Sequence, residues 1–429
     1  MRLSLLALLV GWLVWTGCST PRFVRQEINQ TEKDFHDHIG FVLYDPQALK
    51  TLVDYHGDRY FIPASNTKIF TLYAGLRLLG DSVPSLRYID RNDSLIFWGT
   101  GDPGFLYEDV SSANKTFSFL KTHPSKLFVS TPHFETSYFG PGWSWDDHNY
   151  SYQVERTPFP VYGNRFRVQK SNSTFTIRPS IFNTDVVQET ALQSRHEVVR
   201  DVSSNELKYY PGIKSNGSEW TIPFHYDDEL LGILLADTLK RAVGQVSIPM
   251  PRDAEMIYSL PVDSLYKPMM QESDNFIAEQ LLILCAGMLG DTLKSEIAIR
   301  EVKKRFLSDL PDPPVWVDGS GLSRLNLFTP RSIVRMWEKL DSLISRERLL
   351  GLVAAGGVSG TLKDYYKTEK PFVFGKTGTL SNNHTLSGFL VTRKGKTLIF
   401  SWMNNNFTST SGDVRRRMES VLKNIYERY

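Results

Sequence analysis

PASNTKIF, residues 63–70, lies where an extended segment gives way to a helix. Pro63 cannot donate to a strand ladder, so it ends the extended segment. Apolar side chains then recur at helical spacing up to Gly80, at Ile69, Leu72, Tyr73, Leu76 and Leu79. Ser65 and Lys68 stand three residues apart on one face of this helix, so the amine can reach the hydroxyl. A neutral lysine there could act as general base for a serine nucleophile.

The S-x-x-K spacing is weak evidence when taken alone. It recurs at Ser112–Lys115, Ser264–Lys267 and Ser420–Lys423, where a solvated serine and lysine explain the pattern. Ser65 differs from these because it opens a strand-to-helix junction, a geometry that exposes a nucleophile.

Two further short motifs carry chemistry. Ser273-Asp274-Asn275 stands just before an apolar helical run, where the same residues also suit a helix N-cap. Lys376-Thr377-Gly378-Thr379 lies in a predicted strand. Gly378 leaves room for the backbone of a ligand beside that strand, and Lys376 supplies a positive charge.

In this order the three motifs resemble the S-x-x-K, S-D-N and K-T-G set of penicillin-binding proteins and serine β-lactamases. The long separation between the first two is similar to that of the D-alanyl-D-alanine carboxypeptidase/endopeptidases, class C low-molecular-mass penicillin-binding proteins of the penicillin-binding protein 4 type (peptidase family S13), which carry a large insertion there. Further stretches that resemble this family are Gly101-Asp102-Pro103, Pro141–Asp147, Met269-Met270 and Asp318–Arg324.

The resemblance implies a mixed α/β fold: an antiparallel sheet flanked by helices, as in serine β-lactamases, with a large β-rich inserted domain. Residues 83–250 are rich in aromatic residues, proline, glycine and serine, which predicts short strands and many turns. The expected organisation is an export signal over 1–18, the first part of the transpeptidase-like domain over 21–82, the insertion over 83–254 and the second part over 255–429.

The resemblance also implies a serine acyl-enzyme mechanism. Ser65 would attack the carbonyl between two terminal D-alanines, and Lys68 would take its proton. Lys68 must then be largely neutral near pH 7, against an ordinary pKa of about 10.4. Burial and the nearby charge of Lys376 are both expected to lower that pKa. Ser273 would relay the proton to the leaving amine, while Asn275 would hold Lys68 and the substrate amide.

The same resemblance implies where the substrate is held. The backbone N–H groups of Ser65 and Thr379 would form an oxyanion hole. The residues expected to bind the substrate and its terminal carboxylate are Asp274, Lys376, Thr377, Gly378 and Thr379. This chemistry requires no cofactor, and its expected partners are peptidoglycan stem peptides and β-lactam inhibitors.

The composition, 41% apolar and 22% charged, is ordinary for a soluble globular protein. The formal net charge of +2 argues against a nucleic-acid-binding protein, which usually carries a basic surplus. The nine histidines show no zinc-ligand spacing, so no metal site is expected. Cys285 lies in an apolar helical run and is expected to be a buried, inert thiol.

The N-terminus predicts export. Arg2 precedes an apolar run, Leu3–Trp15, that is too short to cross a bilayer and is typical of a signal peptide. Gly17-Cys18 resembles a bacterial lipobox, although Trp15 stands where leucine is usual. The expected product is an exported, periplasmic lipoprotein anchored to the membrane through Cys18, with a plain cleaved signal as the alternative.

Two other functions stay open at this stage. One is a β-lactamase or esterase on the same fold, which the large insertion and the stretch Asp318–Arg324 disfavour. The other is a catalytically silent lipoprotein that binds the cell wall, which the intact motif residues disfavour.

Overall fold

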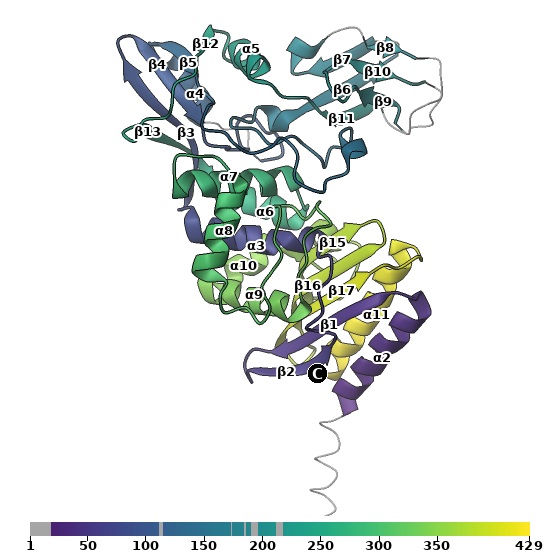
Figure 1. The fold of residues 1–429 in the computed structure, drawn as a ribbon. Coiled ribbons are helices and arrows are strands. Elements are labelled where there is room, and N and C mark those ends of the chain that lie inside the picture. The colour runs from purple at the N-terminus through teal and green to yellow at the C-terminus, as the bar shows by residue number, and fades with distance from the viewer. Residues whose placement is uncertain (1–18, 111–114, 173, 184–185, 190–195, 212–217) are drawn as a thin grey trace, which may run out of the picture.

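The computed structural model describes residues 19–429, apart from 111–114, 173, 184–185, 190–195 and 212–217 (Figure 1). The export signal expected over 1–18, with Cys18, lies outside these residues. None of the helices in the described part of the chain is long and apolar enough to cross a membrane.

A six-stranded antiparallel sheet joins the two ends of the chain. Its order is β14-β15-β16-β17-β1-β2, so strands near the N-terminus lie beside strands near the C-terminus (Figure 1). The pairing of β1 with β17 runs from His38 opposite Asn405 to Tyr44 opposite Ile399. The strands are β1 (His38–Asp45), β2 (Lys50–Tyr55), β14 (Ala354–Ala355), β15 (Val373–Leu380), β16 (Asn383–Val391) and β17 (Thr397–Asn405).

Helices cover both faces of this sheet. One face packs on α2 (Ser19–Phe35) and α11 (Ser411–Arg428). The apolar side chains of α11 are buried there, at Val414, Met418, Val421, Leu422 and Ile425. The other face packs on a helical layer that includes α3 (Lys68–Leu78), α6 (Asp263–Gln271), α7 (Asn275–Leu289), α8 (Ser295–Phe306), α9 (Pro330–Leu343) and α10 (Arg346–Leu352).

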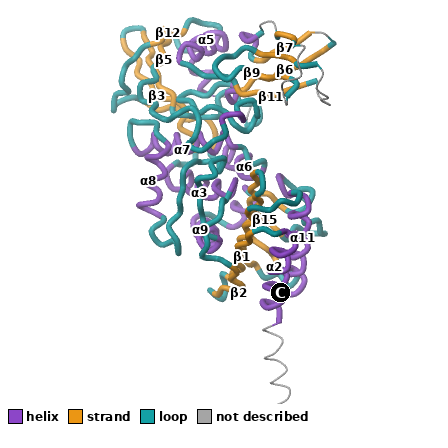
Figure 2. Tube along the Cα trace, turned by 45° about the vertical axis from the view of Figure 1, so that its right-hand side comes forward, coloured by secondary structure: helices purple, strands orange, loops and turns teal. Residues whose placement is uncertain are grey.

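In its described residues, the chain between α3 and α6 forms three smaller sheets, which lie at the opposite end of the molecule from α2 (Figures 1 and 2). A five-stranded sheet has the order β12-β5-β4-β3-β13, and two three-stranded sheets have the orders β11-β6-β7 and β8-β10-β9. Their strands are β3 (Ser82–Arg91), β4 (Ser94–Gly99), β5 (Lys126–Val129), β6 (Arg165–Ser171), β7 (Thr174–Arg178), β8 (Val187–Gln188), β9 (Val198–Arg200), β10 (Leu207–Tyr209), β11 (Glu219–Pro223), β12 (Val243–Gln245) and β13 (Glu255–Pro261). The helices α4 (Lys115–Thr122) and α5 (Asp228–Leu239) accompany these sheets.

The mixed α/β fold expected from the sequence, an antiparallel sheet flanked by helices, is confirmed. The helix expected from Ser65 has a different first turn. Residues Ala64–Thr67 form a 3-10 turn, η1, and the α-helix itself begins at Lys68. This turn holds Ser65 at the end of α3 that lies against β15.

Candidate active site

Ser65 lies in a strained turn that packs tightly on β15. Its neighbour Ala64 has a φ of 47°, in the left-handed region that a residue with a Cβ rarely adopts. A Cβ at Gly378 would lie 2.6 Å from the carbonyl oxygen of Pro63 and 2.8 Å from the amide nitrogen of Ser65. The glycine of the K-T-G motif is therefore required for this close approach, which puts the Ser65 amide beside the strand.

The amine of Lys68 contacts three oxygen atoms. Its Nζ lies 3.0 Å from Ser65 Oγ, 2.6 Å from Asn275 Oδ1 and 2.7 Å from the carbonyl oxygen of Ser320. The side chain is fully buried, and this burial lowers the pKa of Lys68 to about 8. Lys68 therefore loses its proton far more readily than a lysine in water.

The contacts of Lys68 also orient its lone pair. Asn275 Oδ1 and the Ser320 carbonyl oxygen can only accept hydrogen bonds, and Asn275 Nδ2 donates elsewhere, to the carbonyl oxygen of Tyr152 at 3.0 Å. A neutral amine gives its two hydrogens to these two acceptors. Its lone pair then points to the hydroxyl of Ser65, which is the geometry of a general base.

The second lysine lies against the second serine. Lys376 Nζ is 2.9 Å from Ser273 Oγ and 2.9 Å from the carbonyl oxygen of Thr377. Lys376 is fully buried, and desolvation followed by repulsion from Lys68 lowers its pKa well below the ordinary value. The repulsion between the lysines was expected to lower the pKa of Lys68; in the structure it is Lys376 whose pKa this repulsion lowers.

Ser65, Ser273 and Thr379 line a cleft that extends away from them in two directions. On one side a hollow of about 350 Å³ extends toward Thr361, Tyr365, Thr377, His384 and Arg415. On the other side the cleft continues past Asn275 toward Asp146, Asp147, Tyr152, Arg324 and Ser381. Three segments that are far apart in the sequence thus converge on one cavity.

The threonines of β15 are held by side chains that the sequence motifs do not contain. Thr377 Oγ1 donates to Thr361 Oγ1 at 2.7 Å. Thr379 Oγ1 lies 2.8 Å from His384 Nδ1 and 3.3 Å from a guanidinium nitrogen of Arg415. Burial, with the charges of Arg415 and Lys376, lowers the pKa of His384 to about 3, so this imidazole is neutral. Both hydroxyls therefore have fixed orientations at the cleft wall.

Asp274 does not take the expected place at the substrate. Its Oδ1 accepts the amide of Ile277 at 2.9 Å and caps α7. Its Oδ2 accepts the hydroxyl of Tyr107 at 2.6 Å and lies 3.7 Å from Arg165. Protein groups thus occupy both oxygens, and Asp274 is absent from the residues that line the cleft. The N-cap interpretation of this position is the one the structure supports.

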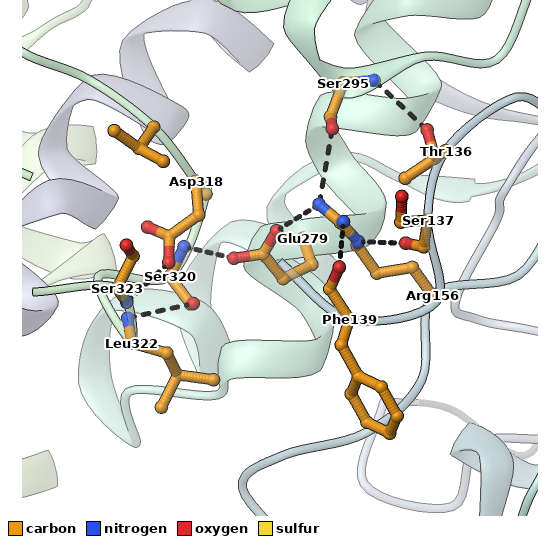
Figure 3. Close-up of polar contacts among 12 residues, drawn as sticks. Thr136, Ser137, Phe139, Arg156, Glu279, Ser295, Asp318, Ser320, Leu322 and Ser323 are labelled. Carbon is orange, nitrogen blue, oxygen red and sulfur yellow. Dashed lines mark hydrogen bonds and ion pairs between the residues drawn. The ribbon is translucent and has the colours of Figure 1, made fainter. Parts of the chain in front are cut away.

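A buried polar chain adjoins Lys68 and consists of Ser320, Glu279 and Arg156, which Figure 3 shows. The amide of Ser320, whose carbonyl contacts Lys68, donates to Glu279 Oε1 at 2.7 Å. Glu279 in turn lies 3.4 Å from Arg156, and both side chains are 1% exposed. Burial and the neighbouring carboxylate of Asp318 raise the pKa of Glu279 above its ordinary value.

Sequence motifs did not identify several residues of this site. Ser320 lies in the stretch Asp318–Arg324, which the sequence singled out only for its resemblance to a family. Glu279 lies one helical turn after Asn275, a spacing that places it near the same helix face. The polar residues that reach the site without a motif are Tyr107, Tyr152, Arg156, Arg165, Thr361, His384 and Arg415.

Known proteins are similar in sequence to most or all of this chain. A curated relative, the D-alanyl-D-alanine carboxypeptidase DacB of Haemophilus influenzae, is 24% identical over 480 residues, which cover 100% of this chain and 98% of the relative. The D-alanyl-D-alanine carboxypeptidase of Actinomadura sp. is 24% identical over 418 residues, with 85% of this chain and 77% of the relative covered.

Solved structures agree with the fold. The crystal structure of penicillin binding protein 4 (dacB) from Haemophilus influenzae superposes with a TM-score of 0.75 at 20% identity and covers 91% of this chain and 97% of that one. The same protein in complex with a β-lactam gives a TM-score of 0.69. The model of the family described as D-Ala-D-Ala carboxypeptidase 3 (S13) matches residues 24–427. Since that match spans nearly the whole chain, the protein belongs to the D-Ala-D-Ala carboxypeptidase 3 (S13) family of serine peptidases.

Proposed function

We propose that this protein hydrolyses the bond between the two terminal D-alanines of peptidoglycan stem peptides, through an acyl-enzyme on Ser65. The observation that carries the proposal is the set of contacts around Lys68, whose amine lies 3.0 Å from Ser65 Oγ with acceptors on its other sides. Membership of the S13 family supports the same reaction.

Acylation begins when neutral Lys68 removes the proton from Ser65. The oxygen of Ser65 then bonds to the carbonyl carbon of the penultimate D-alanine, and the carbonyl oxygen takes the negative charge. The backbone N–H groups of Ser65 and Thr379 donate to that oxyanion, which stabilises the transition state by about 3 kcal/mol per donor in enzymes of this type. Gly378 supports this step because it lets β15 approach the Ser65 amide.

The proton must next reach the leaving amine. Ser273 passes it on from Lys68, with Lys376 at 2.9 Å from Ser273 Oγ stabilising the hydroxyl as it exchanges protons. The C–N bond breaks, the terminal D-alanine leaves as a neutral amine, and Ser65 holds the acyl group as an ester. Asn275 keeps Lys68 in place throughout.

Deacylation repeats these steps with a water molecule as the nucleophile. Lys68 removes a proton from a water molecule, whose oxygen attacks the ester carbon, and the proton returns to the oxygen of Ser65. A β-lactam enters the same path through its lactam C–N bond. Because the amine stays tethered in the opened ring, it remains in the cleft and blocks the water, which explains covalent inhibition. A relative solved with a β-lactam supports this part of the proposal.

The terminal carboxylate of the substrate lies at β15, next to the leaving amine. The hydroxyls of Thr377 and Thr379 line that side of the cleft, and the hydroxyl of Thr379 can donate to it. A carboxypeptidase must recognise this group, because it distinguishes a chain end from an internal peptide bond.

The site is proposed to act outside the cytoplasm. The signal-like run Leu3–Trp15 and the lipobox-like Cys18 support export to the periplasm and lipidation. Radiolabelled palmitate supplied to cells that express the full chain should be incorporated into the wild type and not into Cys18→Ala. Incorporation into Cys18→Ala would contradict the lipid anchor without affecting the catalytic proposal.

The reaction is tested with a purified pentapeptide that ends in D-Ala-D-Ala and with cross-linked wall fragments. Wild-type protein should release free D-alanine from the pentapeptide, and mass analysis of the wall fragments shows whether cross-links are also cut. Ser65→Ala should release none while it keeps the melting temperature of the wild type. Release of D-alanine by Ser65→Ala, or no release by folded wild-type protein, would overturn the proposal.

A further inference from the structure

Three consecutive arginines, Arg415, Arg416 and Arg417, lie near the start of α11. In the structure, two of them are paired with a carboxylate. On α11, Arg416 pairs with Asp413 at 2.6 Å and Arg417 pairs with Asp34 at 2.9 Å. Among the residues that the structure describes, no carboxylate oxygen lies within 4.0 Å of the Arg415 guanidinium. The unpaired member of the three is the one that faces the cleft.

Arg415 lies beside β15, in the part of the cleft where the proposed function places the terminal carboxylate. Its guanidinium is 3.3 Å from the hydroxyl of Thr379 and stands over the ring of Tyr365, with its central carbon 5.9 Å from the ring centroid. It lines the same hollow as Ser65 and Thr377. Asp364 also lines this hollow, but its carboxylate pairs with Lys367 at 3.9 Å. The cation therefore remains available to an anionic ligand beside β15.

Lys376 is a poor anchor for that anion. Its amine is fully buried and already donates to Ser273 and to the carbonyl oxygen of Thr377. Its lowered pKa means that it carries less of its charge than an ordinary lysine. A guanidinium stays protonated at any physiological pH and offers several parallel donors to a carboxylate. His384, held neutral, adds no charge of its own.

We infer that Arg415 is a specificity-determining residue that binds the terminal carboxylate of the substrate, with the hydroxyl of Thr379 as a second donor. The inference rests on the proposed D-Ala-D-Ala hydrolysis. It assigns the recognition of a free chain end to a side chain on the last helix, outside the three sequence motifs. Lys376 then serves the proton path through Ser273.

The test uses two substrates that differ only in the group Arg415 would recognise. One is an acylated tripeptide that ends in D-Ala-D-Ala with a free carboxylate, and the other is the same peptide as its C-terminal amide. The variants are Arg415→Ala, Arg415→Lys and, as the matched control on the same helix, Arg416→Ala. The kcat and KM of each are measured for both peptides, and saturating fluorescent penicillin titrates the intact nucleophile.

Arg415→Ala should lower kcat/KM for the free acid by roughly 10- to 100-fold, which is the loss expected for one charge-assisted hydrogen bond. Most of that loss should appear in KM. Hydrolysis of the amide should change little, because the amide has no charge to lose. Arg415→Lys should recover part of the loss, and Arg416→Ala should match the wild type on both peptides.

Two results would overturn the inference. One is an Arg415→Ala enzyme that hydrolyses the free acid as efficiently as the wild type. The other is an equal loss for the acid and the amide, which is the signature of a merely structural role. A wild-type enzyme that labels with penicillin and hydrolyses neither peptide would instead overturn the proposed function, and the inference with it.

Discussion

Lys68 is fully buried, yet its amine contacts neutral oxygens and no carboxylate lies within ion-pair distance among the described residues. Burial therefore dominates and lowers its pKa. Three carboxylates, Asp318, Asp274 and Glu279, oppose this shift from a distance. Had one of them touched the amine, the ion pair would have kept Lys68 protonated and useless as a base.

The pH dependence of acylation follows from this balance. Acylation needs neutral Lys68, so kcat/KM should rise about tenfold per pH unit at low pH and level off above the pKa of about 8. Glu279→Gln removes a charge that raises this pKa and keeps an oxygen for the amide of Ser320. The acidic limb of the profile should therefore move to lower pH. Penicillin acylation rates between pH 5 and 10 measure this shift.

The control for this prediction is Glu301→Gln, on α8, where the carboxylate pairs with Arg305 at the surface. It should leave the profile unchanged. Glu279→Gln should also destabilise the fold by about 3 kcal/mol, because Arg156 loses its buried partner. An acidic limb that stays in place in Glu279→Gln would show that Glu279 has no electrostatic effect on Lys68.

At the scale of elements, the site depends on how closely β15 approaches the turn η1. The approach requires glycine at position 378, because any Cβ would meet Pro63 and Ser65 below 3.0 Å. The structure thus gives the K-T-G glycine a packing role against the turn η1, in the space where the sequence predicted room for a ligand. Backbone atoms cannot move aside as a flexible side chain can.

Gly378→Ala should push β15 away from Ser65 and separate the two N–H donors of the oxyanion hole. We expect acylation by penicillin to slow by roughly 100-fold or more, the cost of losing one oxyanion donor, while the protein remains folded. Gly351→Ala is the matched control, since nothing lies within 4 Å of a Cβ there and its position in α10 favours alanine. Rates near the wild-type value for Gly378→Ala would contradict this account of the strand.

Local pattern predicted some elements and not others. The apolar residues from Val414 to Ile425 recur at helical spacing, so local sequence alone indicates the last helix. The helix α2 was not expected, because its sequence is mostly polar. Of its described apolar side chains, those of Val24 and Ile28 are fully buried in the core. It is stabilised by packing on the sheet, and that information lies in distant parts of the chain.

The sequence likewise predicted one part of the candidate site, the residues that belong to short motifs, and missed the rest. Ser65, Lys68, Ser273, Asn275 and Lys376 were recognised because their short motifs occur in a fixed order. Arg415 and His384 carry no motif, and they reach the cleft only because β16 and α11 lie beside β15. Contacts of this kind depend on tertiary packing, which residue spacing does not contain.

At the scale of the whole molecule, the segment between α3 and α6 holds the catalytic helix α7 through buried polar contacts. Tyr107 and Arg165 meet Asp274, and Arg156 meets Glu279. Gln280 Nε2 also donates to the carbonyl oxygen of Thr157 at 2.9 Å. These contacts give the large segment a role in positioning Ser273 and Asn275, which flank Asp274.

Asp274→Ala should therefore lower the free energy of unfolding by more than the loss of a helix cap alone, which costs about 1 kcal/mol. It also leaves Arg165 without its buried partner, so we expect a total loss of stability of about 3 kcal/mol or more. Asp274→Asn keeps the cap and an acceptor for Tyr107 and should lose less. Urea unfolding measures both. A stability of Asp274→Asn equal to that of the wild type would show that Arg165 does not depend on this carboxylate, and equal stabilities of the two variants would show that the cap and the acceptor for Tyr107 contribute little.

The most direct test of the central claim is the mass of the intact protein after incubation with benzylpenicillin. We predict that the wild type gains the mass of one penicillin, that proteolysis places the adduct on Ser65, and that Ser65→Ala gains none. We also predict that Lys68→Ala forms the adduct far more slowly than the wild type. An adduct on any other residue, or one that survives in Ser65→Ala, would contradict the assignment of Ser65 as the nucleophile that Lys68 activates.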